Sequence, residues 1–129
     1  MRKFLDDIGV TNRPETMLPA DKRQAQWQQE RDTYGFDERE TWNLQYSFYL
    51  WLYERLKMYL LTAGVNIDLN HHRFVYNETS YTQQQMIDMM LERLEFYFSD
   101  KYQSNDQEQW PYIEEIAKLW ATVLPAMWW

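Results

Sequence analysis

The sequence predicts an all-α fold: a compact bundle of three principal helices plus a smaller N-terminal helix, with a central aromatic-rich helix at about residues 38–62. Three observations favour this class. The chain of 129 residues has only 3 Gly and 4 Pro, which is few for a strand-rich protein with many tight turns. Apolar residues recur at helical spacing in three segments. Helix-capping patterns precede two of those segments.

The first 35 residues are predicted to be a peripheral N-terminal segment with one short helix, and residues 36–129 to be the helical bundle domain. The short helix covers about residues 20–33, and Gly35 follows it as a C-terminal stop. Because this segment is mostly polar, we expect Trp27 to be its main anchor on the rest of the protein.

The central helix is predicted to begin at a capping box of Asp37 and Glu40 and to end before Gly64. Its uncharged run covers only residues 41–53, which is shorter than the about 20 apolar residues that a membrane span needs. Apolar side chains lie around well over half of this helix, so we expect neighbouring helices to cover it on several sides.

One stripe of the central helix is rich in aromatic residues. Packing within the domain is the ordinary explanation of such a stripe. Tyr is also common at protein interfaces, because it combines a large apolar body with a polar tip. The alternative is therefore a surface for a partner or for a second copy of the chain, formed by Trp42, Tyr46, Tyr49 and Tyr53.

Two amphipathic helices are predicted in the second half of the chain. The first begins at a capping box of Ser80 and Gln83 and runs to about residue 102. The last covers about residues 110–124, with Pro111 tolerated in its first turn. The segment "VNIDLNHHRFVYNETS" is predicted to connect the central helix to these two, and a connector of this length is either functional or partly structured.

Few residues indicate a reaction centre. His71 and His72 are adjacent in the connector, where neighbouring side chains diverge, so an exposed polar loop is favoured over a metal or acid–base site. The chain has no Cys, no Glu-x-x-His pair for a di-iron bundle, no Gly-rich phosphate loop and no nucleophile–base motif. We therefore expect no enzyme, no metal and no cofactor. Arg55 falls on an apolar stripe of the central helix, where stacking on an aromatic ring or pairing with a buried carboxylate is the favoured role. The alternative is contact with an anionic ligand, for which Arg55 and Arg73 are the candidates.

The net charge of −7 is concentrated in one part of the chain, since residues 74–129 carry nine acidic and three basic side chains. Such a chain is unsuited to direct binding of nucleic acid or of an anionic membrane. An acidic surface can bind a basic protein, and the same charge also serves solubility. The candidate contact residues are Asp88, Glu92, Glu95, Asp100, Asp106, Glu108, Glu114 and Glu115.

The stretch "YGFDERETWNLQYSFYLWLYERLKMYL" resembles the "GYSD-x-D-x-W-x-LD…PRL-x-x-F" motif of a family of small uncharacterised tailed-bacteriophage proteins. The later "QQQMIDMMLERLEFYF" is similar to their second amphipathic helix, so the resemblance covers about residues 34–129. The resemblance implies a phage or prophage protein made in the bacterial cytoplasm, and it implies no activity. The matching positions are Tyr34, Gly35, Asp37, Trp42, Leu44, Arg55, Leu56 and Tyr59.

These observations predict a non-enzymatic phage accessory protein that acts in the cytoplasm by binding another protein. One form of this function is inhibition of a host or defence nucleic-acid-binding protein through the acidic surface. Three alternatives stay open. The protein could bind a nucleotide-like small ligand, with aromatic side chains and Arg55 or Arg73 as contacts. It could be a structural or assembly component of the virion, and it could form a homodimer.

Overall fold

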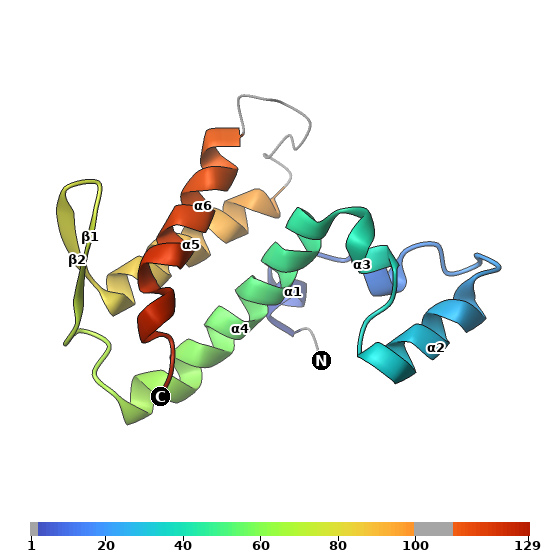
Figure 1. Cartoon of the computed structure of the whole chain (residues 1–129), viewed down its shortest axis with the longest axis horizontal. Helices are drawn as coiled ribbons and strands as arrows, with labels where there is room; N and C mark the ends of the chain where they lie inside the picture. Colours follow the sequence, from blue (N-terminus) through green and yellow to red (C-terminus); the bar gives the residue numbers. More distant parts are fainter. Residues whose placement is uncertain (1–2, 100–109) are drawn as a thin grey trace. The chain divides into compact units, whose positions relative to one another are not determined.

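The computed structural model describes residues 3–99 and 110–129, which are mostly helical (Figure 1). Contacts within the chain define two compact units, Met1–Leu52 and Tyr53–Trp129, called here the N-terminal and the C-terminal unit. The boundary between them falls inside the longest helix. The elements in chain order are α1 (Lys3–Asp7), η1 (Pro14–Thr16), α2 (Gln24–Tyr34), α3 (Arg39–Trp42), α4 (Leu44–Asn66), β1 (Arg73–Tyr76), β2 (Thr79–Thr82), α5 (Gln83–Tyr97), α6 (Trp110–Val123) and η3 (Leu124–Ala126).

The prediction of an all-α fold is wrong, because β1 and β2 form a two-stranded antiparallel sheet inside the predicted connector. Val75 pairs with Ser80 and Tyr76 with Thr79. The turn between the strands consists of Asn77 and Glu78, whose φ angles are 50° and 64°. Left-handed φ at both central residues is typical of a two-residue type I′ hairpin turn. The sequence hides this turn because Glu stands where such turns usually have Gly.

The predicted number of helices is also wrong, since the described residues contain six α-helices rather than four. Two of them, α1 and α3, have only five and four residues. The predicted helix over residues 38–62 is interrupted at Asn43, whose φ of −142° and ψ of 87° are not helical. It therefore becomes the short α3 followed by α4.

The N-terminal unit is organised around the carboxylate of Asp37, which is only 2% exposed. Oδ1 accepts a hydrogen bond from Arg39 Nε at 3.0 Å, and Oδ2 accepts from Arg39 Nη2 and Arg31 Nη1, both at 2.7 Å. Burial raises the pKa of Asp37, but the hydrogen bonds from the two guanidinium groups outweigh it and hold the pKa below its ordinary value. The predicted capping box is wrong, because Glu38 is the N-cap of α3 and makes no side-chain cap hydrogen bond.

Trp27 anchors α2, as its sequence predicts, and it is fully buried. Two guanidinium groups lie over its indole, with Arg39 Cζ 4.4 Å and Arg23 Cζ 4.9 Å from the ring centroid. Its Nε1 donates a hydrogen bond to Glu38 Oε1 at 2.9 Å. Trp42 meets the indole edge-on, at 5.8 Å between ring centroids. Cation–π contacts and the ion pairs of Asp37 thus join α2 to α3.

The prediction that neighbouring helices cover α4 on several sides is wrong for part of its apolar surface. Leu44, Phe48 and Trp51 are exposed, and the rings of the last two stack with 6.0 Å between centroids. The residues of α4 that are buried are Tyr49, Leu50, Leu52, Tyr53, Leu56 and Ala63. Among the described residues, no helix has both the length and the apolar character to cross a membrane.

In the C-terminal unit, α5 packs against α6, and the hairpin contacts both helices (Figure 1). The shared core contains Met86, Met90 and Leu94 of α5 with Ile116 and Leu119 of α6. Helix α5 begins two residues later than predicted.

The capping box of α5 is made by Thr82 and Gln85 rather than by Ser80 and Gln83. Thr82 Oγ1 accepts from the backbone N–H of Gln85 at 3.2 Å, and Gln85 Oε1 accepts from the backbone N–H of Thr82 at 2.8 Å. Ser80 cannot cap the helix, because it is a strand residue paired with Val75. The pattern of a capping box recurs two residues along in this sequence, and strand pairing selects the second copy.

Candidate functional site

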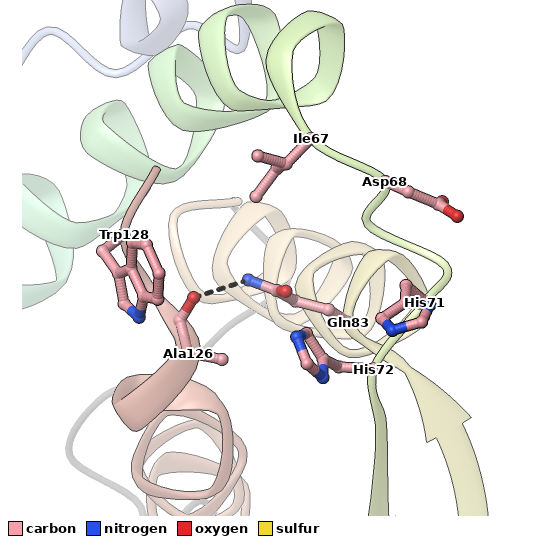
Figure 2. Close-up of a pocket in the computed structure, with 7 residues that line it drawn as sticks. All are labelled: Ile67, Asp68, His71, His72, Gln83, Ala126 and Trp128. Atoms are coloured by element: carbon pink, nitrogen blue, oxygen red, sulfur yellow. Dashed lines mark hydrogen bonds between the residues drawn. The ribbon is translucent and has the colours of Figure 1, made fainter.

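The C-terminal unit contains a pocket of about 340 Å³ beside the start of α5 (Figure 2). This volume lies at the lower end of the range of about 300–1,000 Å³ that is typical of small-ligand sites. The pocket is called the Gln83 pocket here, after its most buried polar residue. It is lined by Ile67, Asp68, His71, His72, Gln83, Ala126 and Trp128.

The loop between α4 and β1 brings Asp68 and the two histidines to this pocket. The Asp68 carboxylate accepts a hydrogen bond from the backbone N–H of Asn70 at 2.9 Å, and the Asp68 carbonyl accepts from the N–H of His71 at 3.2 Å. Such an Asx turn is a common local use of Asp. The start of α5 holds the loop in place, because the N–H of Gln83 donates to the carbonyl of His72.

The side chain of Gln83 is 1% exposed and ties the C-terminal tail to α5. Its Nε2 lies 3.1 Å from the hydroxyl of Tyr59, 3.2 Å from the carbonyl oxygen of Ala126 and 3.4 Å from Sδ of Met127. The Tyr59 hydroxyl donates to the carbonyl of Trp128 at 3.1 Å, so it accepts from Gln83. A carbonyl is only an acceptor, so this network fixes the amide with its nitrogen toward the tail.

The fixed amide leaves Gln83 Oε1 as an acceptor at the pocket. No described residue donates a hydrogen bond to this atom. Solvent can reach it, because it is absent from the fully buried side-chain atoms without a partner. Figure 2 shows the amide nitrogen of Gln83 directed at the Ala126 oxygen and the amide oxygen directed away from it. Because buried amide oxygens almost always have a partner, an open one at a cavity marks a position for a ligand N–H or for water.

The prediction that the side chains of His71 and His72 diverge is wrong. Their rings meet edge to face, with 5.0 Å between centroids, and both line the pocket. Neither imidazole makes a hydrogen bond with any residue that the structure describes, so four ring nitrogens are open to a ligand or to solvent. Within residues 3–99 and 110–129, no three His, Cys, Asp or Glu side chains are arranged to hold a metal ion.

The lining is suited to a flat, polar and uncharged molecule. Trp128 supplies an aromatic wall, and Ile67 supplies an apolar contact. Gln83 supplies an acceptor, and each neutral imidazole supplies one donor and one acceptor. Of the seven lining residues, Asp68 is acidic and none is Lys or Arg.

The predicted ligand contacts Arg55 and Arg73 do not line this pocket. Arg73 lies on β1, where its Nε donates to Ser80 Oγ at 2.8 Å and its Nη2 donates to the Ser80 carbonyl at 3.2 Å. Its guanidinium therefore braces the hairpin. Arg55 lies exposed on α4.

The predicted acidic surface is only partly open among the described residues. Glu95 accepts a hydrogen bond from the Tyr53 hydroxyl at 2.8 Å, and Glu115 forms an ion pair with Arg93. Asp88 is exposed and accepts from Gln84 Nε2 at 3.0 Å. The side chains of Glu92 and Glu114 are exposed. Asp100, Asp106 and Glu108 lie outside the described residues.

The predicted aromatic interface stripe is divided between surface and core. Trp42 is exposed and Tyr46 is half-buried, with its hydroxyl donating to the carbonyl of Asn12 at 3.1 Å. Burial raises the pKa of Tyr46 above its ordinary value. Tyr49 and Tyr53 are buried.

Sequence reasoning missed the pocket, and one signal could have found it. Gln83 shares the face of α5 that carries Met86, Ile87, Met90 and Leu94, so it is an amide on an otherwise apolar stripe. A polar group at such a position needs partners, and α4 and the C-terminal tail supply them through Tyr59, Ala126 and Met127. Comparisons of the chain with protein-family models, with curated proteins and with solved structures found no match.

Proposed function

We propose that this chain is a small-molecule-binding protein and that the Gln83 pocket is its site. One observation carries the proposal: a fully buried amide whose nitrogen is occupied and whose oxygen has no described partner borders a cavity of about 340 Å³. Two unengaged imidazoles and an indole border the same cavity. Convergent polar groups on a mostly apolar pocket are the usual composition of a ligand site.

A thermal-shift screen of a library of small heterocycles tests this function. Trp128→Ala is the site variant, because the side chain is 74% exposed and its loss should leave the fold intact. Trp129→Ala is the matched control, since this neighbour is 58% exposed and does not line the pocket. Compounds are expected to raise Tm of the wild type and of Trp129→Ala, and to raise Tm of Trp128→Ala less or not at all. Equal shifts in all three proteins would place binding elsewhere and contradict the proposal.

The second candidate function is the protein-binding role of a phage accessory protein, with a basic nucleic-acid-binding protein as partner. The observation that favours it is that Asp88 and Glu92 are both exposed one helical turn apart on α5, with Glu114 exposed on α6. Capture of host proteins on the immobilised chain tests it. A specific basic partner should be lost with Asp88→Asn/Glu92→Gln and kept with Asp7→Asn/Asp32→Asn, which removes the same charge elsewhere. Equal loss in both variants would indicate attraction by net charge alone.

A further inference from the structure

We infer that the ligand of the Gln83 pocket is an uncharged nucleobase, held as the free base or the nucleoside and not as the nucleotide. The inference rests on the proposed small-molecule function and names the chemical class of its ligand. The structural basis is the juxtaposition of three features at one cavity: the Trp128 indole, the open acceptor Gln83 Oε1, and the absence of Lys and Arg from the described lining residues.

The shape of the site favours a flat ring. The Trp128 indole and the imidazoles of His71 and His72 lie around the cavity, with the Gln83 amide between them (Figure 2). Stacking on an aromatic side chain is available to every nucleobase, because each has a π face. Ile67 adds an apolar contact at the edge of the same space.

The hydrogen-bonding groups favour a ring that carries its own N–H. Gln83 cannot act as a donor to a ligand without giving up Tyr59 or Ala126, so it offers only Oε1. An imide N–H or an exocyclic amine of a base matches this acceptor. The imidazoles of His71 and His72 can then pair with the remaining donors and acceptors on the edge of the base.

The charges disfavour a phosphate. Asp68 is the charged residue of the described lining, and residues 74–129 carry a net charge of −6. Arg73, which was expected to contact an anionic ligand, is held by Ser80 on the hairpin instead. A phosphate would therefore find repulsion without a guanidinium or an ammonium to offset it.

Isothermal titration calorimetry at pH 8 tests the inference. The ligands are adenosine, guanosine, cytidine and uridine, their 5′-monophosphates, and a ten-nucleotide single strand of mixed sequence. At least one nucleoside should bind, its monophosphate should bind no more tightly, and the single strand should bind no more tightly per base. Trp128→Ala should weaken the nucleoside at least tenfold, while Trp129→Ala should leave Kd within about twofold. A derivative of the same nucleoside, methylated at the N–H that faces Gln83, should lose at least tenfold.

Several results would overturn the inference. If the monophosphate bound more tightly than the nucleoside, the site would recognise a phosphate group. If the single strand bound more tightly per base than the nucleoside, the ligand would be a base within a nucleic acid. Binding of other heterocycles, weakened by Trp128→Ala, with no binding of any nucleoside would reject the base but keep the small-molecule function. The absence of any binding compound in both the nucleoside panel and the heterocycle library would reject both proposals.

Discussion

Gln83 and Ala126 are joined by a hydrogen bond of 3.2 Å from the side-chain amide of α5 to a main-chain carbonyl of the C-terminal tail. The residues are far apart in sequence, and this bond brings the tail to the start of α5. The same amide accepts no hydrogen bond at its oxygen from any described residue. One side chain therefore both fixes the tail that carries Trp128 and presents an acceptor to the pocket, which couples the stability of the C-terminal unit to the geometry of the site.

Replacement of Gln83 by Leu should destabilise the protein by about 1–3 kcal/mol, because the Ala126 carbonyl and the Tyr59 hydroxyl lose a buried partner. Urea denaturation measures this free energy of unfolding. Gln84→Leu is the control, since the Gln84 side chain donates to exposed Asp88 and its loss should cost less than about 0.5 kcal/mol. Equal effects of the two substitutions would mean that the tail is not held by Gln83.

Asp37→Asn should be among the most destabilising substitutions in the N-terminal unit, by about 3–5 kcal/mol, because it leaves the buried Arg39 guanidinium without a charged partner. Chemical denaturation again provides the measurement. Asp21→Asn removes a partly exposed carboxylate, which pairs with the exposed Arg23, and should have a far smaller effect. If the Asp37 and Asp21 variants unfold at the same urea concentration, the buried network is not what holds α2 to α3.

The same carboxylate predicts a pH dependence. The folded-state pKa of Asp37 is below its ordinary value, so the unfolded chain binds more protons as the pH falls below about 4. The stabilisation is complete above that pH and is lost as the pH falls toward the folded-state pKa. Unfolding followed from pH 6 to pH 2 should therefore show a smaller loss of stability in Asp37→Asn than in the wild type. An unchanged slope would show that other carboxylates cause the acid sensitivity.

Thr82→Ala should cost about 0.5–2 kcal/mol, because it removes the acceptor for the backbone N–H of Gln85 at the start of α5. Ser80→Ala, at the position that the sequence pattern indicates, removes an exposed hydrogen bond from Arg73 Nε and should change the free energy of unfolding by less than about 0.5 kcal/mol. Comparison of the two variants by thermal and urea denaturation decides which residue caps the helix. A larger effect at Ser80 would contradict the observed start of α5.

The longer helices α4, α5 and α6 could be predicted approximately from the sequence because their apolar periodicity is local information, whereas the short α1 and α3 could not. Met86, Met90 and Leu94 repeat at helical spacing, and they are buried on one face of α5. The hairpin could not be predicted in the same way. Its turn has Glu78 at a left-handed φ of 64°, and only the pairing of β1 with β2 selects that conformation. Ser80 shows the same effect, since strand pairing overrides its capping pattern.

The site was harder to predict than the fold, because its residues are brought together by tertiary contacts. The segment between Asp68 and Trp128 includes the whole of α5 and α6, and no sequence spacing predicts that these two residues meet at one pocket. The adjacency of the two histidines is visible in the sequence, but their edge-to-face contact depends on the conformation of the loop. The sequence pattern indicates a capping role for Gln83, but its side-chain partners lie on α4 and in the tail.

The central claim is that a small molecule binds in the Gln83 pocket, and chemical-shift mapping of ¹⁵N-labelled protein tests it most directly. On addition of a compound from the thermal-shift screen, the side-chain amide signals of Gln83 and the indole N–H signal of Trp128 should move in a saturable way. The indole signal of Trp129 should move much less, because this residue does not line the pocket. Saturable shifts that leave both Gln83 and Trp128 unmoved would contradict the claim.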